Sequence, residues 1–265
     1  MFFAELAFFS MLNKELLQIK GTVVPLGSHK RGGATTLASG CYQYMFYGCT
    51  SLAQAPELPA TTLASSCYRY MFNGCTGLTQ APALPVTTLV YECYRCMFSG
   101  CTGLTQAPAL PATTLAYDCY DSMFQNCKGL TQAPALPATT LADECYQYMF
   151  RGCTSLTQAP ELPATTLADY CYCYMFQDCT SLTQAPALPA TTLVYGCYSS
   201  MFYRCKKLEY IKCLATNISA SDCTYNWVYG VAKSGTFVKD PSMTSWKTGT
   251  SGIPKGWTVT NAQLT

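Results

Sequence analysis

Charge is scarce in this sequence, because Lys, Arg, Asp and Glu make up only 11% of its 265 residues and the formal net charge is +2. Proteins that hold a nucleic-acid backbone need a basic surface, since much of their affinity comes from neutralising phosphates. We therefore expect no nucleic-acid partner. Long apolar runs are missing too, and the longest are far shorter than the ~20 residues of a membrane-spanning helix. No membrane insertion is expected.

The groups that carry most enzyme chemistry are also rare. His29 is the only histidine and lies in a glycine-rich segment, so a Ser-His-Asp or Cys-His mechanism would rest on this one imidazole. Cys93 and Cys96 form an isolated Cys-x-x-Cys pair, whereas a structural zinc site needs about four ligands. No glycine-rich phosphate loop is present. The sequence predicts a protein that is not an enzyme and that binds no metal and no cofactor.

What the sequence does contain is a repeat. The string Thr-Thr-Leu-x-x-x-Cys-Tyr-x-x-Met-Phe-x-x-Cys-x-x-Leu occurs seven times at a step of 26 residues, with its Cys-Tyr pair at 41, 67, 93, 119, 145, 171 and 197. Such a period is typical of a solenoid, whose units stack to bury a shared core. We expect an N-terminal helical cap over 1–33, an array over 34–215, and a degenerate repeat with a β-containing C-terminal cap over 216–265.

Each copy predicts one helix and one short strand. Counted from the first cysteine, Leu (−4), Cys (0), Met (+4) and Cys (+8) recur at four-residue spacing, with Tyr at +1 and Phe at +5. This spacing is typical of a helix, and the glycines common at +7 indicate its end. The Leu-Thr-Gln-Ala-Pro-Ala-Leu-Pro stretch that follows must be extended, because its prolines oppose helix. Stacking would give a short parallel ladder with Leu78 inward. The predicted fold is an α/β, leucine-rich-repeat-like solenoid of seven strand-helix repeats.

The string Leu-x-x-x-Cys-Tyr-x-x-Met-Phe-x-x-Cys-x-x-Leu-x-x-Ala-Pro-x-Leu-Pro resembles the leucine-rich repeats of the BspA-like bacterial surface proteins. Their units carry an Ala-Phe-x-x-Cys-x-x-Leu-x-x-Ile-x-Leu-Pro core. The unit here is longer, Cys-Tyr-x-x-Met-Phe replaces Ala-Phe, and Ala-Pro replaces the strand Ile. The resemblance implies adhesion or host interaction at the cell surface or outside the cell. No signal peptide is visible, because Glu5 interrupts the apolar start and no basic residue precedes it.

Differences between the copies are concentrated at positions −2, −1, +2, +3 and +6. These 35 sites (five positions in seven copies) hold ten Tyr and not one Lys. A freely drifting solvated face should collect Lys, Glu, Ala and Thr, whereas Tyr with Ser, Asp and Arg is typical of recognition surfaces. The pattern predicts a surface that binds a protein or a polysaccharide. Its candidate residues are Tyr44, Tyr47, Arg69, Tyr70, Tyr91, Arg95, Tyr117, Asp121, Tyr148, Arg151, Tyr170, Tyr174 and Tyr195.

Four alternatives to this interpretation stay open. The variable face could be drifting under weak constraint, or its tyrosines could stack within the array. The repeated Thr-Gln pairs, such as Thr79 and Gln80, form a competing polar surface on the strand side. The whole chain could also be a structural spacer, or a virion or surface component without a specific ligand.

Fourteen of the 18 cysteines, two in each of seven copies, occupy the repeat positions 0 and +8. Eight residues along a helix separate such a pair by ~12 Å, too far for a disulfide within one unit. We predict buried thiols that pack as small apolar groups. Disulfides between neighbouring copies are the alternative for an exported protein.

Overall fold

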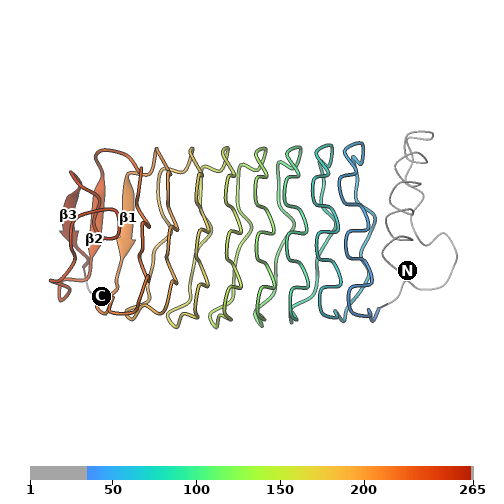
Figure 1. Ribbon diagram of the computed structural model, residues 1–265, viewed down its shortest axis with the longest axis horizontal. Coiled ribbons are helices and arrows are strands. Elements are labelled where there is room, and N and C mark those ends of the chain that lie inside the picture. Colours follow the sequence, from blue (N-terminus) through green and yellow to red (C-terminus); the bar gives the residue numbers. More distant parts are fainter. Residues whose placement is uncertain (1–34, 264–265) are drawn as a thin grey trace, which may run out of the picture.

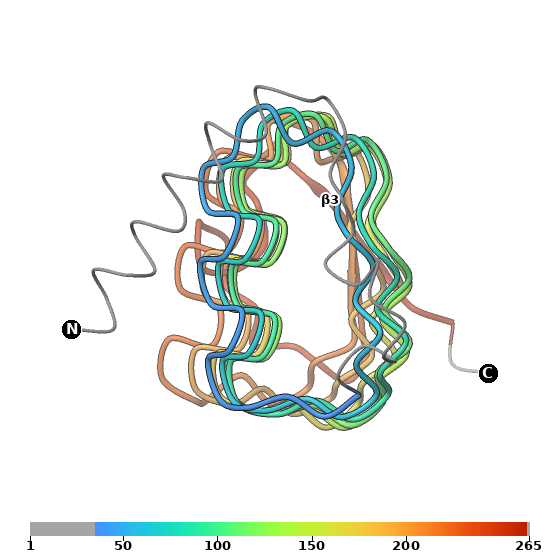
Figure 2. The same cartoon turned by 90° about the vertical axis from the view of Figure 1, so that its right-hand side faces the viewer.

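The computed structural model describes residues 35–263, and the N-terminal cap predicted for 1–33 lies outside this range. The described chain winds into coils that stack side by side along the long axis of the molecule (Figure 1). Viewed along that axis, the coils superpose (Figure 2). The repeat solenoid predicted from the 26-residue period is therefore confirmed. Each coil is named below by its first cysteine.

One wall of every coil is a ribbon of turns, and the predicted helix is wrong: residues 35–263 contain no helix. In the Cys67 coil, Met71 N–H donates to the Tyr68 carbonyl three residues back (3.1 Å). The N–H groups between such bonds donate to the next coil, Tyr68 to Cys93 (3.0 Å) and Tyr70 to Arg95 (2.9 Å). An α-helix would instead bond each N–H to the carbonyl four residues back. We call this surface the turn wall.

Left-handed residues cause the difference. Positions −1, +3 and +7 have positive φ, which in the Cys67 coil means Ser66 (55°), Tyr70 (56°) and Gly74 (73°). A left-handed residue at the third position of a turn reverses the direction of the chain, so a right-handed helix cannot continue through it. The chain therefore bends inward and outward every four residues. This gives the apolar positions the same four-residue spacing that a helix would give.

The opposite wall is nearly straight (Figure 2). Neighbouring coils meet there at single parallel bridges such as Gln54–Gln80, because the prolines at +15 and +18 lack N–H donors. The Cys197 coil has Lys212 in place of the first proline, and here a continuous strand forms. β1 (Tyr210–Cys213), β2 (Thr236–Lys239) and β3 (Thr258–Asn261) make a parallel sheet in the order β1-β2-β3 at the C-terminal end of the stack (Figure 1).

The constant positions of the repeat fill the interior. Leu78 is fully buried, as predicted, and the leucines at the same position in the other copies are buried as well. Tyr at +1 and Phe at +5 stack from coil to coil, with ring centroids 5.8 Å apart for Tyr68–Tyr94 and 5.6 Å for Phe72–Phe98. Aromatic pairs of this kind add stability beyond the burial of their area. Two aromatic columns therefore run along the axis of the solenoid.

None of the 18 cysteines, which all lie within residues 35–263, forms a disulfide, and all except Cys41 are buried, so the prediction of buried packing thiols is confirmed. From Cys75 to Cys205, the six cysteines at +8 have a further contact, because each donates to the carbonyl of the phenylalanine in the preceding coil. The Sγ–O distance is 3.0 Å from Cys75 to Phe46 and 3.0 Å from Cys127 to Phe98. Desolvation by burial raises the pKa of Cys67 to about 11, which keeps that thiol protonated at neutral pH.

The C-terminal tail covers the last coil. Trp227 occupies the Met position of the degenerate Cys223 copy, is fully buried and stacks on Tyr198 (ring centroids 6.2 Å apart). Its indole N–H donates to the Gly252 carbonyl (2.8 Å). Trp246 stacks on its other face and Trp257 is also buried. These side chains shield an apolar layer that would otherwise be exposed.

Candidate binding surface

The outward residue pairs of the turn wall are the variable positions of the sequence. Two inward residues alternate with two outward ones, so Cys and Tyr at 0 and +1 point into the core while +2 and +3 point out. The candidate residues differ in exposure. Tyr44, Tyr47, Tyr91, Tyr117 and Tyr195 are exposed (41–47%), Arg69, Tyr70, Arg95, Tyr148, Arg151, Tyr170 and Tyr174 are half-buried, and Asp121 is buried. The structure thus brings twelve of the thirteen to the surface of one wall.

Several of these tyrosines stack on one another across coils. Tyr44 and Tyr70 have ring centroids 4.8 Å apart, and Tyr148 and Tyr174 are 4.7 Å apart, with nearly parallel planes in both pairs. The alternative of tyrosine stacking within the array therefore holds at position +3. At position −2 the rings are more open to solvent, and Tyr117 donates its hydroxyl hydrogen to the Glu144 carboxylate (3.0 Å). That hydrogen bond raises the pKa of Tyr117 to about 12.

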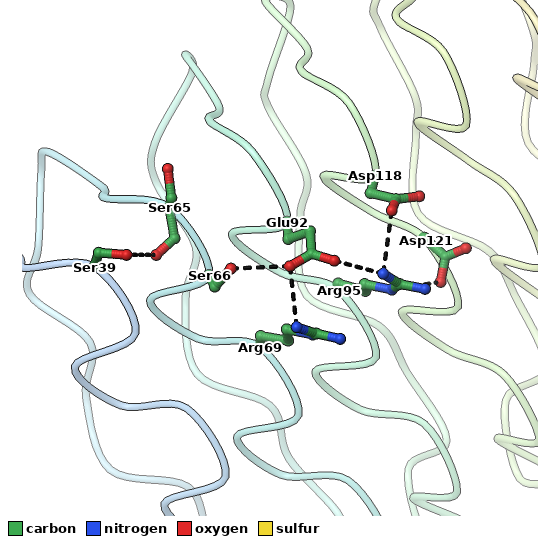
Figure 3. Close-up of polar contacts among 8 residues, drawn as sticks. All are labelled: Ser39, Ser65, Ser66, Arg69, Glu92, Arg95, Asp118 and Asp121. Carbon is green, nitrogen blue, oxygen red and sulfur yellow. Dashed lines mark hydrogen bonds and ion pairs between the residues drawn. The ribbon is translucent and has the colours of Figure 1, made fainter.

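A charged cluster spans the turn wall of the coils that begin at Cys67, Cys93 and Cys119 (Figure 3). Arg95 contacts Glu92, and its guanidinium nitrogens lie 3.2 Å from Asp118 and 3.4 Å from Asp121. Arg69 approaches the same Glu92 from the preceding coil (3.1 Å). The three carboxylates are almost completely buried while both guanidinium groups stay partly exposed. The cluster therefore ties three successive coils together by charge-assisted contacts.

This cluster corrects one prediction. Asp121 was expected to offer its carboxylate to a ligand, but the residue is only 2% exposed and its carboxylate forms an ion pair with Arg95. Desolvation raises its pKa to about 6, and desolvation together with the neighbouring Asp121 raises the pKa of Asp118 to about 7. Sequence reasoning missed Glu92 and Asp118 as partners. The available signal was opposite charge at −1 and +2 in adjacent copies, which stacking brings together.

The straight wall presents the Thr-Gln ladder. Thr79 and Gln80 are exposed, but they bond to the preceding coil, with Thr79 Oγ1 donating to the Ala53 carbonyl (3.2 Å) and Gln54 Nε2 donating to Gln80 Oε1 (3.4 Å). Much of the hydrogen-bonding capacity of this ladder is therefore used between coils. A cavity of about 330 Å³ lies at the corner between the walls, lined by Thr61, Thr62, Leu63, Pro85, Val86, Thr87, Thr88 and Val90. None of the candidate residues lines it.

Residues 35–263 contain no group of three or more His, Cys, Asp or Glu placed to hold a metal ion. Cys93 and Cys96, the isolated Cys-x-x-Cys pair, are both buried free thiols. Within the same residues, no helix has the length and apolar character needed to cross a membrane.

Stacked coils with inward leucines and a variable outer wall define a leucine-rich-repeat solenoid. The chain matches the model of the BspA type leucine-rich repeat region, in six copies, over residues 41–157 and 116–228. It belongs to this family, which confirms the resemblance drawn from the repeat. The family is generally surface-associated in bacteria, and its repeats suggest protein binding or adhesion. No curated protein and no solved structure matched the chain.

Proposed function

We propose that this chain is a non-catalytic recognition scaffold that binds a protein or a polysaccharide through its turn wall, at the cell surface or outside the cell. One observation supports the proposal: the variable positions line the outer side of a single wall, where 25 of their 35 sites are exposed or half-buried, whereas the invariant Cys, Tyr, Met and Phe positions are buried beyond the first coil. The variable set contains rigid, amphipathic tyrosines, which give large contact area at small entropic cost.

The most open part of this surface is position −2. Tyr91 and Tyr117 lie in adjacent coils with ring centroids 5.7 Å apart, and Tyr195 follows further along the same line of residues. Their rings are 41–47% exposed. Exposed aromatic side chains in a row are suited to a ligand that runs along the axis of the solenoid.

A structural spacer without a ligand is the second candidate. The Tyr44–Tyr70 and Tyr148–Tyr174 stacks favour it, because rings packed face to face contribute to cohesion between coils. This reading predicts that no partner binds saturably to the turn wall.

Serine substitution of Tyr91, Tyr117 and Tyr195 separates the two candidates. The folded wild-type chain is screened against an array of bacterial and host glycans and a panel of purified extracellular proteins. The proposal expects a saturable ligand whose affinity falls at least tenfold in the triple variant, with the thermal melting curve nearly unchanged. Replacement of Gln106, Gln132 and Gln158 on the straight wall by alanine is the matched control. Absence of any saturable ligand, or equal loss in the control, contradicts the proposal.

A further inference from the structure

Carboxylates outnumber basic side chains in the middle of the turn wall. At the variable positions of the four coils that begin at Cys93, Cys119, Cys145 and Cys171 there are six acidic residues, Glu92, Asp118, Asp121, Asp143, Glu144 and Asp169, and two basic residues, Arg95 and Arg151. Glu92, Asp118 and Asp121 are buried and paired with Arg69 or Arg95. In the Cys145 and Cys171 coils the outward acids Asp143, Glu144 and Asp169 therefore exceed the single basic residue Arg151 by two. A surface with this excess attracts cations and repels anionic ligands.

The wall itself shows how it holds a guanidinium group. Arg69 lies 3.1 Å from the Glu92 carboxylate, and its guanidinium carbon is 5.2 Å from the centroid of the Tyr70 ring. A carboxylate and a tyrosine face thus hold the same cation, by a charge-assisted contact and a cation–π contact. Arg95 is held by three carboxylates of its own coil and the next.

Carboxylates and tyrosines also lie together two coils further on, where Tyr117 donates to Glu144 (3.0 Å) and the Asp169 N–H donates to Asp143 Oδ1 (3.0 Å). Asp143 and Asp169 are exposed at position −2 of successive coils, and the exposed Tyr117 and Tyr195 flank them at the same position on either side. Glu144 and the half-buried Tyr170 lie at the adjacent position −1. Within residues 35–263, no basic side chain lies within 4 Å of Asp143, Glu144 or Asp169. We call Tyr117, Asp143, Glu144, Asp169, Tyr170 and Tyr195 the outer acidic patch.

We propose that the outer acidic patch binds arginine or lysine side chains of a basic polypeptide partner. The proposal rests on the proposed function and names the class of ligand for it. Charge complementarity selects this partner, because an anionic polysaccharide would meet Asp143 and Asp169 directly. The Arg69 site supplies the matching chemistry, and exposed tyrosines next to carboxylates provide both elements of it for an incoming cation.

Binding of a short peptide of alternating arginine and glycine to the full chain tests this proposal. The peptide carries a fluorophore, and anisotropy is measured at low and at physiological salt. We expect saturable binding that weakens with salt, and a peptide with glutamine in place of arginine should not bind. The double variant Asp143→Asn, Asp169→Asn should bind about tenfold more weakly, since it removes two exposed charge pairs. Glu57→Gln with Glu161→Gln, two exposed acids outside the turn wall, is the matched control and should bind as the wild type does.

Each other outcome counts against the inference in its own way. Equal weakening in both double variants shows non-specific attraction and overturns it. Self-association at low salt that needs Asp143 and Asp169 would assign the patch to the exposed lysines of a second copy, such as Lys206 and Lys255. If the arginine peptide fails to bind while a neutral ligand still needs Tyr91, Tyr117 and Tyr195, the cationic partner is wrong and the proposed function stands. If neither binds, both fail.

Discussion

At the residue scale, the fold depends on side chains held in a backbone region that L-residues rarely adopt. Among residues 35–263, seventeen non-glycine residues have positive φ, and they include Tyr70, Tyr148 and Tyr174 with φ of 54–57°. Each such residue costs about 1 kcal/mol or more. The cost is offset because the N–H of each left-handed residue in the array donates to the next coil, as Ser200 does to Tyr225 (2.8 Å). An isolated unit would lack these hydrogen bonds, so the left-handed residues are stabilised only where coils stack.

Glycine substitution at such a position should stabilise the protein. Ser200 is buried with φ of 51°, so Ser200→Gly is expected to raise the free energy of unfolding by about 0.5–1 kcal/mol, measured by urea denaturation. A helix at this position would give the opposite sign, because glycine destabilises helix interiors by a similar amount. The neighbouring Ser199→Gly, where φ is not positive, is the control and should destabilise. A loss of stability in Ser200→Gly would contradict the turn ribbon.

At the element scale, the sequence determines which side chains point inward but not the path of the backbone. The invariant Cys, Tyr, Met and Phe positions are all predicted to be internal, and they are buried in the described array apart from its first coil. Helix and turn ribbon both place two residues in and two out, so apolar spacing alone cannot separate them. Glycine at +7 indicated a left-handed residue, while Tyr, Ser and Glu at +3 and −1 gave no such indication.

The same alternation of inward and outward positions made the candidate surface predictable from the sequence. It did not predict which of the outward side chains neighbouring coils would cover. Most variable positions are exposed or half-buried, as expected, but ten of the 35 sites are buried. Asp121 is one of them, because Arg95 of the preceding coil pairs with its carboxylate. A pattern read within one copy treats each outward residue as solvated. Contacts between copies depend on the register of 26 residues, which places −1 and +2 side chains of neighbouring coils together.

The buried cluster should make stability depend on pH. The pKa of Asp118 is about 7 in the folded chain against about 3.9 in an unfolded one. The folded state therefore binds more protons between these values, and the free energy of unfolding falls as pH rises from about 4 to 7. The Asp118→Asn variant lacks this titrating group, so its free energy of unfolding should fall less between pH 4 and pH 7 than that of the wild type. Urea denaturation at several pH values measures the slope. The exposed Asp169→Asn serves as control, and an Asp118→Asn slope equal to that of the wild type contradicts the role of the cluster.

At the scale of the whole molecule, the hydrogen bonds between coils of the turn wall share one direction. N–H groups of one coil donate to carbonyls of the following coil, so the last coil presents donors with no further coil to receive them. Residues of the tail supply the acceptors: Val228 N–H donates to the Thr250 carbonyl (3.1 Å) and Asn226 N–H to Ser251 Oγ (2.9 Å). The tail is therefore the terminal cap that a solenoid with one-directional bonding requires.

Removing the central side chain of this cap should destabilise the array from its C-terminal end. Trp227→Ala is expected to cost about 3–5 kcal/mol, because the indole is fully buried and hydrogen-bonded. Coils contact only their neighbours, so hydrogen-exchange protection should fall first in the Cys197 coil and only weakly in the Cys93 coil. Trp246→Phe is the matched control, since its buried indole N–H has no partner and its loss should cost little. A uniform fall in protection along the chain would mean that the solenoid unfolds as one cooperative unit, against the nearest-neighbour coupling that the stacked coils indicate.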